Sequence, residues 1–345
     1  MKKVFQCLPI LLSAIVLSAE AEHARSVIWD NAPAYQWHAA YPVGNGRLGA
    51  MPFGQFPHEQ ILINEETIWA NGPALVMPEN SFQYLEQIRT LEAAGDYAGA
   101  DRTLERELLD SKEAYDYQLA GWLDLEYVNA AQWTDTVREL NLETGVARSV
   151  HTLSDGSTIT QNVYASAVDD VIVVSVSSST GIDIAISMDG GIVQDGDIVK
   201  AAAGEGENAT QFISRIRALP ADNVTPSGNT LEVQDAREIT VYLSVATDFN
   251  REDSSAKLPD GWQNKALQDL DALTGKAAEQ VEQDAIADHQ SYFSRMDVDF
   301  GTTADAILAL PTPDRLQRIK NGNDDDPDLI ETYFQFGRYL LIASS

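Results

Sequence analysis

Carboxylates are the first candidates for chemistry in this 345-residue sequence, which carries 53 Asp and Glu residues. A glycosidase needs two carboxyl groups that flank one bond, roughly 5–10 Å apart. Glu65 and Glu66 are adjacent, so on a strand their side chains point to opposite faces and cannot flank one bond. An acid and a base would have to come from separate elements, and no spacing singles out such a pair.

Nucleophiles and metal ligands are sparse in the sequence. The single cysteine is Cys7, and neither a G-x-S-x-G motif nor a Ser, His and Asp arrangement stands out. The histidines lack the H-E-x-x-H and H-x-H spacings of zinc sites, which favours structural or solvent-facing roles and predicts no metal or other cofactor. These histidines are His23, His38, His58, His151 and His289.

The segment Gly44 to Gly49 reads G-N-G-R-L-G and matches the dinucleotide fingerprint G-x-G-x-x-G. That fingerprint requires a buried strand before it and a helix that opens within it. Pro42 precedes the motif and Pro52 follows it, which spoils a helix at this place. We therefore expect the glycines to shape a tight loop beside a strand.

Aromatic and amide side chains are concentrated between residues 29 and 71. Indole rings stack on the apolar faces of sugars, and Asn, Glu and Arg bond sugar hydroxyls, so this composition suits a carbohydrate. Tryptophans in the core of a β-sandwich would give the same pattern. The candidates are Trp29, Trp37, Asn45, Arg47, Asn64, Glu65, Thr67, Trp69 and Asn71.

An acidic run, residues 321–326, allows two interpretations. Its carboxylates could bind calcium, but the alternate-position spacing and the closing Glu of an EF-hand loop are missing. Helix capping explains the run better, with Asp326 at the N-cap, Pro327 at the first helical position and Asp328 in the first turn.

The elements that must position these side chains are mostly strands. Between residues 118 and 249 short β segments alternate with turns such as Asp155-Gly156 and Asp195-Gly196, without intervening helices, which favours an antiparallel β-sandwich. The predicted strands are 118–128, 137–142, 147–153, 157–165, 171–177, 183–188, 211–219, 230–233 and 239–247.

Helical periodicity appears in three places. Residues 80–109 predict a helical hairpin inserted among the strands, with Gly95 ending one helix and Asp96 capping the next. Residues 262–273 and 276–296 predict connector helices, and a short helix is expected over residues 314–319. The helix that Pro327 opens is apolar on nearly every face, so we expect it to be buried on all sides, within a helical domain that continues beyond residue 345. The alternative is a C-terminal helix that packs back on the sandwich or in a dimer.

Net charge and the first 21 residues bound the class of protein. A formal charge of −30 argues against nucleic acid and anionic membranes as partners. Lys2 and Lys3, an apolar stretch to Leu17 and the small residues around Ala19 predict a signal peptide over residues 1–21, with a membrane anchor as the alternative. Its removal leaves no cysteine and a charge of −31, because Lys2, Lys3 and Glu20 leave with it. The sequence thus predicts a secreted or periplasmic protein with no membrane span after signal removal.

Several segments together resemble the N-terminal part of glycoside hydrolase family 95, the inverting α-L-fucosidase family. The stretch from Trp29 to Pro73 contains PVGNGRLGA and NEETIW, and YDYQLAGWLDLEY, AIADHQSYFSRMDVDF and LIETYFQFGRYLLIASS follow in order. Departures are small: Gln55-Phe56-Pro57 stands where a Gly-rich turn is usual, and Glu66 and Ile68 replace a more usual Asp and Leu.

The resemblance implies a mainly β fold: a large antiparallel β-sandwich with an inserted helical hairpin, a helical linker and an (α/α) catalytic barrel. The expected divisions are a signal at 1–21, the sandwich at 22–255, the linker at 256–300 and the barrel's first, incomplete part at 301–345. The family's general acid and its Asn-assisted carboxylate lie in later barrel segments, so no catalytic residue is carried over and this chain is expected to be inactive alone. Asn45, Arg47, Asn64, Glu65, Thr67 and Trp69 are predicted to form part of the pocket wall.

Fucosylated oligosaccharides or polysaccharides are the implied substrates, and the catalytic barrel beyond this chain is the implied partner domain. Three alternatives remain open: a carbohydrate-binding module, a purely structural β-sandwich, and a related glycosidase or phosphorylase with the same sandwich-plus-barrel plan.

Overall fold

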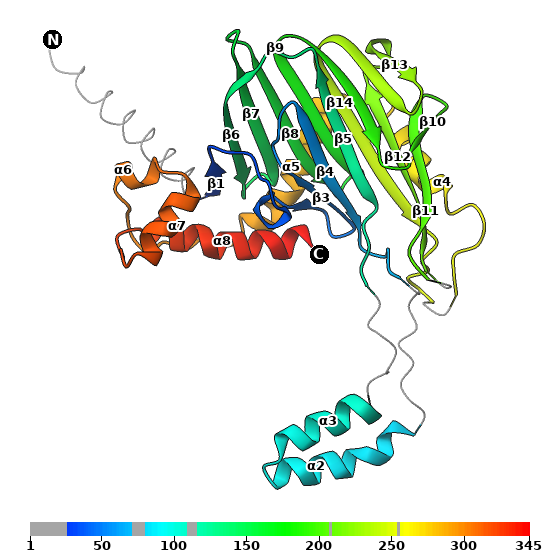
Figure 1. The fold of residues 1–345 in the computed structure, drawn as a ribbon, viewed down its shortest axis with the longest axis vertical. Helices are drawn as coiled ribbons and strands as arrows, with labels where there is room; N and C mark the ends of the chain where they lie inside the picture. The colour runs from blue at the N-terminus through cyan, green and yellow to red at the C-terminus, as the bar shows by residue number, and fades with distance from the viewer. Residues whose placement is uncertain (1–25, 71–79, 109–115, 207–208, 254–255) are drawn as a thin grey trace, which may run out of the picture.

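A computed structural model describes residues 26–70, 80–108, 116–206, 209–253 and 256–345. The predicted signal peptide lies outside the described residues. Within them the strands form one 14-stranded antiparallel sheet that curls into two packed layers (Figure 1). The mainly β class is therefore confirmed.

The first layer is formed mainly by strands β2 to β5, which come early in the chain. Here β2, β3, β4 and β5 pair in sequence order, and β5 then pairs with the second half of β9. The bounds are β2 Val43–Gly44, β3 Leu48–Pro52, β4 His58–Glu65 and β5 Gly121–Val128. They are preceded by β1 (Val27–Asp30), which belongs to the other layer, and by a 3-10 turn, η1, at Trp37–Ala39.

The other layer follows the order β1-β6-β7-β8-β9-β14-β12-β11-β10, and β13 pairs with β14. Strands β7 and β8 of this layer alternate buried with mostly half-buried positions, because one face of each strand lies in the core. The bounds are β6 Trp133–Asn141, β7 Val146–Leu153, β8 Thr158–Ser166, β9 Val171–Met188, β10 Ile192–Gln194, β11 Asp197–Ala203, β12 Gln211–Leu219, β13 Val224–Ser227 and β14 Thr230–Thr247, with a 3-10 turn, η3, at Ala221–Asn223.

Two long strands correct the predicted strand list. Segments 171–177 and 183–188 are one strand, β9, and segments 230–233 and 239–247 are one strand, β14. The polar run Ser177 to Gly181 resembles a turn, but here β9 passes from one layer to the other and its backbone stays extended. The β10–β11 hairpin was not among the predicted strands, although its Asp195-Gly196 turn was identified.

The core lies between the layers. Ile61 and Ile63 of β4 and Leu123 and Leu125 of β5 are fully buried against residues of the opposite layer, such as Val174. Outside the second layer, α4 (Asn264–Ala272) and α5 (Ala278–Phe293) cover a separate apolar cluster, which confirms the predicted connector helices (Figure 1). Clusters on both faces of this layer explain why β9 and β14 are so rich in Val and Ile.

The helical hairpin is confirmed between β4 and β5. It comprises η2 (Ser81–Tyr84), α2 (Leu85–Ala93) and α3 (Tyr97–Glu107). Asp96 caps α3, because its side chain accepts a hydrogen bond from the amide of Gly99 at 2.9 Å.

The C-terminal helices are α6 (Asp305–Leu308), α7 (Thr312–Lys320) and α8 (Pro327–Ala343). The predicted capping is confirmed: Pro327 opens α8, and the carboxylate of Asp326 accepts from the amide of Leu329 at 3.1 Å. The same carboxylate forms two buried hydrogen bonds with Arg315, at 2.7 and 2.9 Å. Arg315 therefore joins α7 to the start of α8.

Within this chain helix α8 is buried on one face, and its burial on all sides by a helical domain beyond residue 345 stays a prediction. Leu329 and Tyr339 face the rest of the chain, and the Tyr339 hydroxyl donates to the carbonyl of Pro42 at 2.7 Å. On the outward face, Ile330, Tyr333 and Leu341 are 54%, 76% and 68% exposed. The described part of the chain covers only one face of this apolar helix. None of the described helices is long and apolar enough to cross a membrane.

Candidate functional site

The glycine motif forms the turn of a β-hairpin, as predicted. Val43 pairs with Ala50 and Gly44 with Gly49, so Asn45 to Arg47 make the turn between β2 and β3. The Asn45 carboxamide oxygen accepts from the amides of Arg47 and Leu48 at 3.1 and 2.7 Å, and its nitrogen donates to the carbonyl of Ser166 at 2.9 Å. Asn45 therefore uses its side chain to shape this turn and to tie it to β8.

The hairpin turn lies directly against the end of α8. The Gly46 amide donates to the carbonyl of Ala343 at 2.9 Å. A Cβ atom on Gly44 would meet that same carbonyl oxygen, and one on Gly46, which has φ +87°, would meet the carbonyl of Ser345. The glycines are needed here for close approach of two backbones.

Arg47 lies at the centre of a polar cluster behind the turn. Its Nε donates to Asp170 at 2.7 Å, and its terminal nitrogens lie 3.8 Å from Glu65 and 3.9 Å from Asp269. Lys265 of α4 adds a second cation, 2.8 Å from both Asp170 and Asp269. This Arg47 cluster, made of Arg47, Glu65, Asp170, Lys265 and Asp269, joins the β2–β3 turn, β4, α4 and the β8–β9 turn.

Electrostatics differ among the carboxylates of the Arg47 cluster. Glu65 is 2% exposed, and burial raises its pKa although Thr67 and Arg47 oppose the rise. At Asp170 burial acts in the same direction, but hydrogen bonds from Arg47 and Lys265 outweigh it and lower the pKa. Glu65 accepts from the amide and hydroxyl of Thr67 at 2.7 and 2.6 Å. The carboxylates of Glu65 and Asp170 are thus both bound by protein groups, which suits a structural role better than proton transfer.

The remaining predicted residues lie on or just after β4. Asn64 is paired opposite Gly49 and is half-buried. Thr67 shares a hydroxyl hydrogen bond of 2.7 Å with Thr247 of β14. Trp69 is 41% exposed, donates its indole N–H to the carbonyl of Glu66 at 2.9 Å and packs edge-on against Tyr117. The fold brings Asn45, Arg47, Glu65 and Thr67 into one neighbourhood, with Trp69 at its border. Their contact with a sugar stays a prediction.

A pocket of about 480 Å³ opens beside the hairpin turn, between the sandwich, α5 and α8. Of the predicted residues only Asn45 lines it, together with Gly44. The sequence reasoning missed His289 and Tyr292 of α5 and Leu341 of α8, which also line the pocket. The segment DHQSYF was the available signal, because it stands within the connector that carries the family resemblance.

His289 in this pocket has a structural partner. Its Nε2 lies 2.8 Å from the carbonyl oxygen of Leu142, and burial lowers the pKa of the ring, so the neutral form prevails. A neutral imidazole whose N–H is bound to a carbonyl is a poor general acid. In the residues that the structure covers, no group of three or more His, Cys, Asp or Glu side chains could hold a metal ion.

Comparison with known proteins identifies the family. Residues 28–252 match the model described as glycosyl hydrolase family 65, N-terminal domain, and residues 277–345 match the glycosyl hydrolase family 95 catalytic domain. Because the first match spans more than half of the chain, the chain belongs to the glycosyl hydrolases that carry a family 65 N-terminal domain. The family 95 catalytic match begins next to the start of α5.

Two curated relatives match nearly the whole chain. Alpha-L-fucosidase 2 of Arabidopsis thaliana is 25% identical over 99% of this chain and 47% of its own length. Probable alpha-fucosidase A of Aspergillus oryzae is 22% identical over 97% of this chain and 48% of its own length. The chain thus spans about half the length of the curated relatives it matches.

A solved structure shares the fold of this chain. A putative kojibiose phosphorylase from the human microbiome superposes with a TM-score of 0.54 at 12% identity, covering 92% of this chain and 41% of that protein. At this identity the likeness supports the architecture alone.

Proposed function

We propose that this chain is the N-terminal part of an exported α-L-fucosidase-type hydrolase that releases terminal fucose from glycans with inversion. The observation that carries the proposal is the match to proteins named α-fucosidases over nearly the whole chain, with the family 95 catalytic match at its C-terminal end. Export rests on the signal-like residues 1–21.

The sandwich acts in this proposal as the support of the catalytic domain. The hairpin turn at Gly44 and Gly46 fixes the end of α8, and Tyr339 anchors the middle of the same helix to Pro42. The outward face of α8, with Ile330, Tyr333 and Leu341 exposed, suits packing against further helices of a catalytic barrel. The pocket lined by Asn45 would then face the barrel.

We further propose that the 345-residue chain does not hydrolyse fucosides alone. An inverting glycosidase needs an acid and a base about 6.5–9.5 Å apart, with room for sugar and water between them. Near the predicted wall, Glu65 is buried and held by Thr67, while Asp170 and Asp269 are paired with Arg47 and Lys265. These carboxylates are already bound by protein groups.

Hydrolysis of 4-nitrophenyl α-L-fucoside tests both statements. The 345-residue chain should show no turnover, whereas the chain joined to a complete family 95 catalytic domain should release fucose whose first-formed anomer, followed by NMR, is β. Turnover by the 345-residue chain would overturn the placement of the catalytic groups. Release of 4-nitrophenol that requires inorganic phosphate would instead assign a phosphorylase.

A further inference from the structure

A second pocket, of about 290 Å³, lies at the opposite end of the sandwich from α8. Its size is near the lower end of the range of roughly 300–1,000 Å³ found for small-molecule sites. Strand β8 connects the two ends: Ser166 at one end bonds Asn45, and Ile159 at the other lines this second pocket. The intervening steps of β8 place them roughly 24 Å apart, at about 3.4 Å per residue. We call it the far pocket.

The far pocket exists because β9 changes layers at this point. Ser178 still pairs with Ile159 of β8, whereas Asp183 pairs with Val128 of β5. Between these positions β9 passes from one layer to the other at the open end of the core. Its partner β14 stays paired with it, with register shifts around Ala236. The two layers therefore separate here and leave a concave opening.

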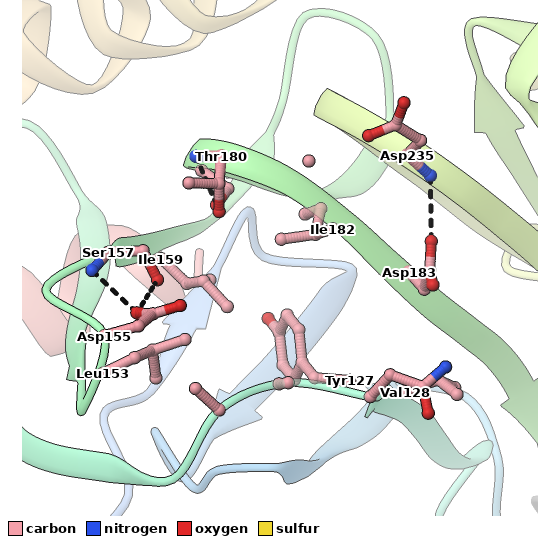
Figure 2. Close-up of a pocket in the computed structure, with 15 residues that line it drawn as sticks. Tyr127, Val128, Leu153, Asp155, Ser157, Ile159, Thr180, Ile182, Asp183 and Asp235 are labelled. Carbon is pink, nitrogen blue, oxygen red and sulfur yellow. Dashed lines mark hydrogen bonds between the residues drawn. The ribbon is translucent and has the colours of Figure 1, made fainter.

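The floor of the far pocket is apolar and fixed. It is formed by Tyr127, Leu153, Ile159 and Ile182, which are all buried (Figure 2). The Tyr127 hydroxyl donates to the side-chain oxygen of Gln161 at 3.1 Å, so its ring cannot turn out of place. These side chains are between 1% and 7% exposed, so they offer a ligand a small apolar contact at the base of a mainly polar pocket.

The rim of the far pocket is rich in hydrogen-bond acceptors. Figure 2 shows Asp155 on one side of Tyr127 and Ile182, and Asp183 and Asp235 on the other. Asp155 accepts from the amide and hydroxyl of Ser157 at 2.9 and 2.6 Å, and Asp183 accepts from the amide of Asp235 at 2.9 Å. These bonds engage Oδ1 in both cases. Among the described residues no hydrogen bond engages Oδ2 of Asp155 or Asp183.

The charge of this rim selects the class of ligand. Of the described residues that line the far pocket, none is Lys, Arg or His, so phosphate, sulfate and carboxylate groups would be repelled. A metal ion is not supported, because the described side chains include no group of three metal ligands. The site calls for a ligand that donates several hydrogen bonds, carries no negative charge and has an apolar face. A neutral sugar meets all three requirements.

We propose that the far pocket binds a neutral sugar residue of a glycan chain, at a site separate from the end of the sandwich that carries α8. The proposal rests on the far pocket alone and is independent of the proposed hydrolytic activity. A glycan held here would bind the protein without occupying its catalytic domain.

Isothermal titration of the 345-residue chain tests this assignment, with 2′-fucosyllactose and xyloglucan as neutral probes and polygalacturonate as an anionic control. At least one neutral probe should bind saturably, and polygalacturonate should not. The double variant Asp155→Asn, Asp183→Asn should lower the association constant at least tenfold. At both positions the Asn side-chain oxygen can still accept the internal hydrogen bonds, while an amide N–H donor replaces the oxygen that has no hydrogen bond in the folded chain.

Two further variants locate the binding. Ala130 is exposed at the rim, so Ala130→Trp should block the far pocket and abolish binding. Asp195→Asn is the matched control: it removes one exposed charge from the β10–β11 turn and should leave the affinity within twofold.

Three results would overturn the proposal: no binding of either neutral probe, unchanged affinity in both pocket variants, or equal loss in Asp195→Asn. Circular dichroism of each variant shows whether the sandwich has folded. Fucoside hydrolysis is measured separately, on the chain joined to a complete family 95 catalytic domain. Absence of hydrolysis there, with intact glycan binding by the 345-residue chain, would refute only the proposed function.

Discussion

The two ends of the sandwich use acidic side chains in opposite ways. At the end that carries α8, the carboxylates of Glu65, Asp170 and Asp269 surround Arg47, and Lys265 completes the cluster. At the far pocket, the carboxylates of Asp155 and Asp183 accept from amide and hydroxyl groups, and none of the described lining residues is a cation. The acidic residues behind the net charge of −30 thus have two different roles. Acids paired with cations stabilise the fold, whereas acids without a cation remain available to a ligand.

The largest effect should come from Arg47→Ala. The substitution leaves Glu65 and its neighbours without their central cation, and removal of one partner of a buried ion pair costs about 3–5 kcal/mol. Urea denaturation measures the free energy of unfolding. Arg89→Ala is the control, because the Arg89 side chain is 71% exposed and its ion pair with Glu86 should contribute about 1 kcal/mol or less. Equal losses in the two variants would contradict a structural role for the Arg47 cluster.

Gly46→Ala should have the next largest effect. Gly46 has φ +87°, and a Cβ atom there would also meet the carbonyl of Ser345. Gly156→Ala is a close control, since Gly156 has φ +84° and its surroundings leave open space for a Cβ atom. Both variants carry the backbone strain of about 1–2 kcal/mol, but only Gly46→Ala should lose a further ~1–3 kcal/mol from overpacking against the end of α8. Indistinguishable unfolding free energies would mean that the turn does not fix α8.

Acid should weaken the α8 end through Asp170. Its pKa is lowered in the folded chain, so its contribution to stability is complete above the ordinary value of 3.8 and is lost as the pH falls through the lowered one. Asp170→Asn keeps a residue that tolerates φ +59°. It should cost about 1 kcal/mol at pH 7 after allowance for partial exposure, and the difference from wild type should shrink as the pH falls below 3.8. A cost that stays constant with pH would rule out the ion pair as its cause.

The smallest effect on stability is expected at the far pocket. The triple variant Asp155→Asn, Asp183→Asn, Asp235→Asn keeps the internal acceptors and the left-handed backbone of residue 235. Its unfolding free energy should lie within about 0.5 kcal/mol of wild type, as for surface substitutions. A loss above about 2 kcal/mol would show that these acids are structural too, and the contrast between the two ends would disappear.

Local signals predicted much of the fold. Asp96 and Asp326 were identified as helix caps because capping depends on residues only three positions away, and both caps are present. The Gly44 to Gly49 segment was assigned to a tight loop because nearby prolines exclude a helix. The strand sequence predicted a sandwich, since turn pairs and alternation are equally local.

Long-range features were beyond such reasoning. Arg47 and Asp170 are 123 residues apart, and only the curl of the sheet brings them within 2.7 Å. The far pocket takes Asp155, Asp183 and Asp235 from separate segments of the chain, and no local spacing relates them. The crossing of β9 between layers was missed because its polar residues Ser177 to Gly181 resemble a turn.

The long strands β9 and β14 also determine how the sandwich unfolds. Each has 18 residues, and the two pair with each other along both halves of β9, the half that pairs with β8 and the half that pairs with β5. Neither layer therefore holds a complete set of hydrogen bonds without the other. The sandwich should consequently unfold as one cooperative unit, and amide protons along the middle of both strands should exchange with solvent only when the entire domain opens.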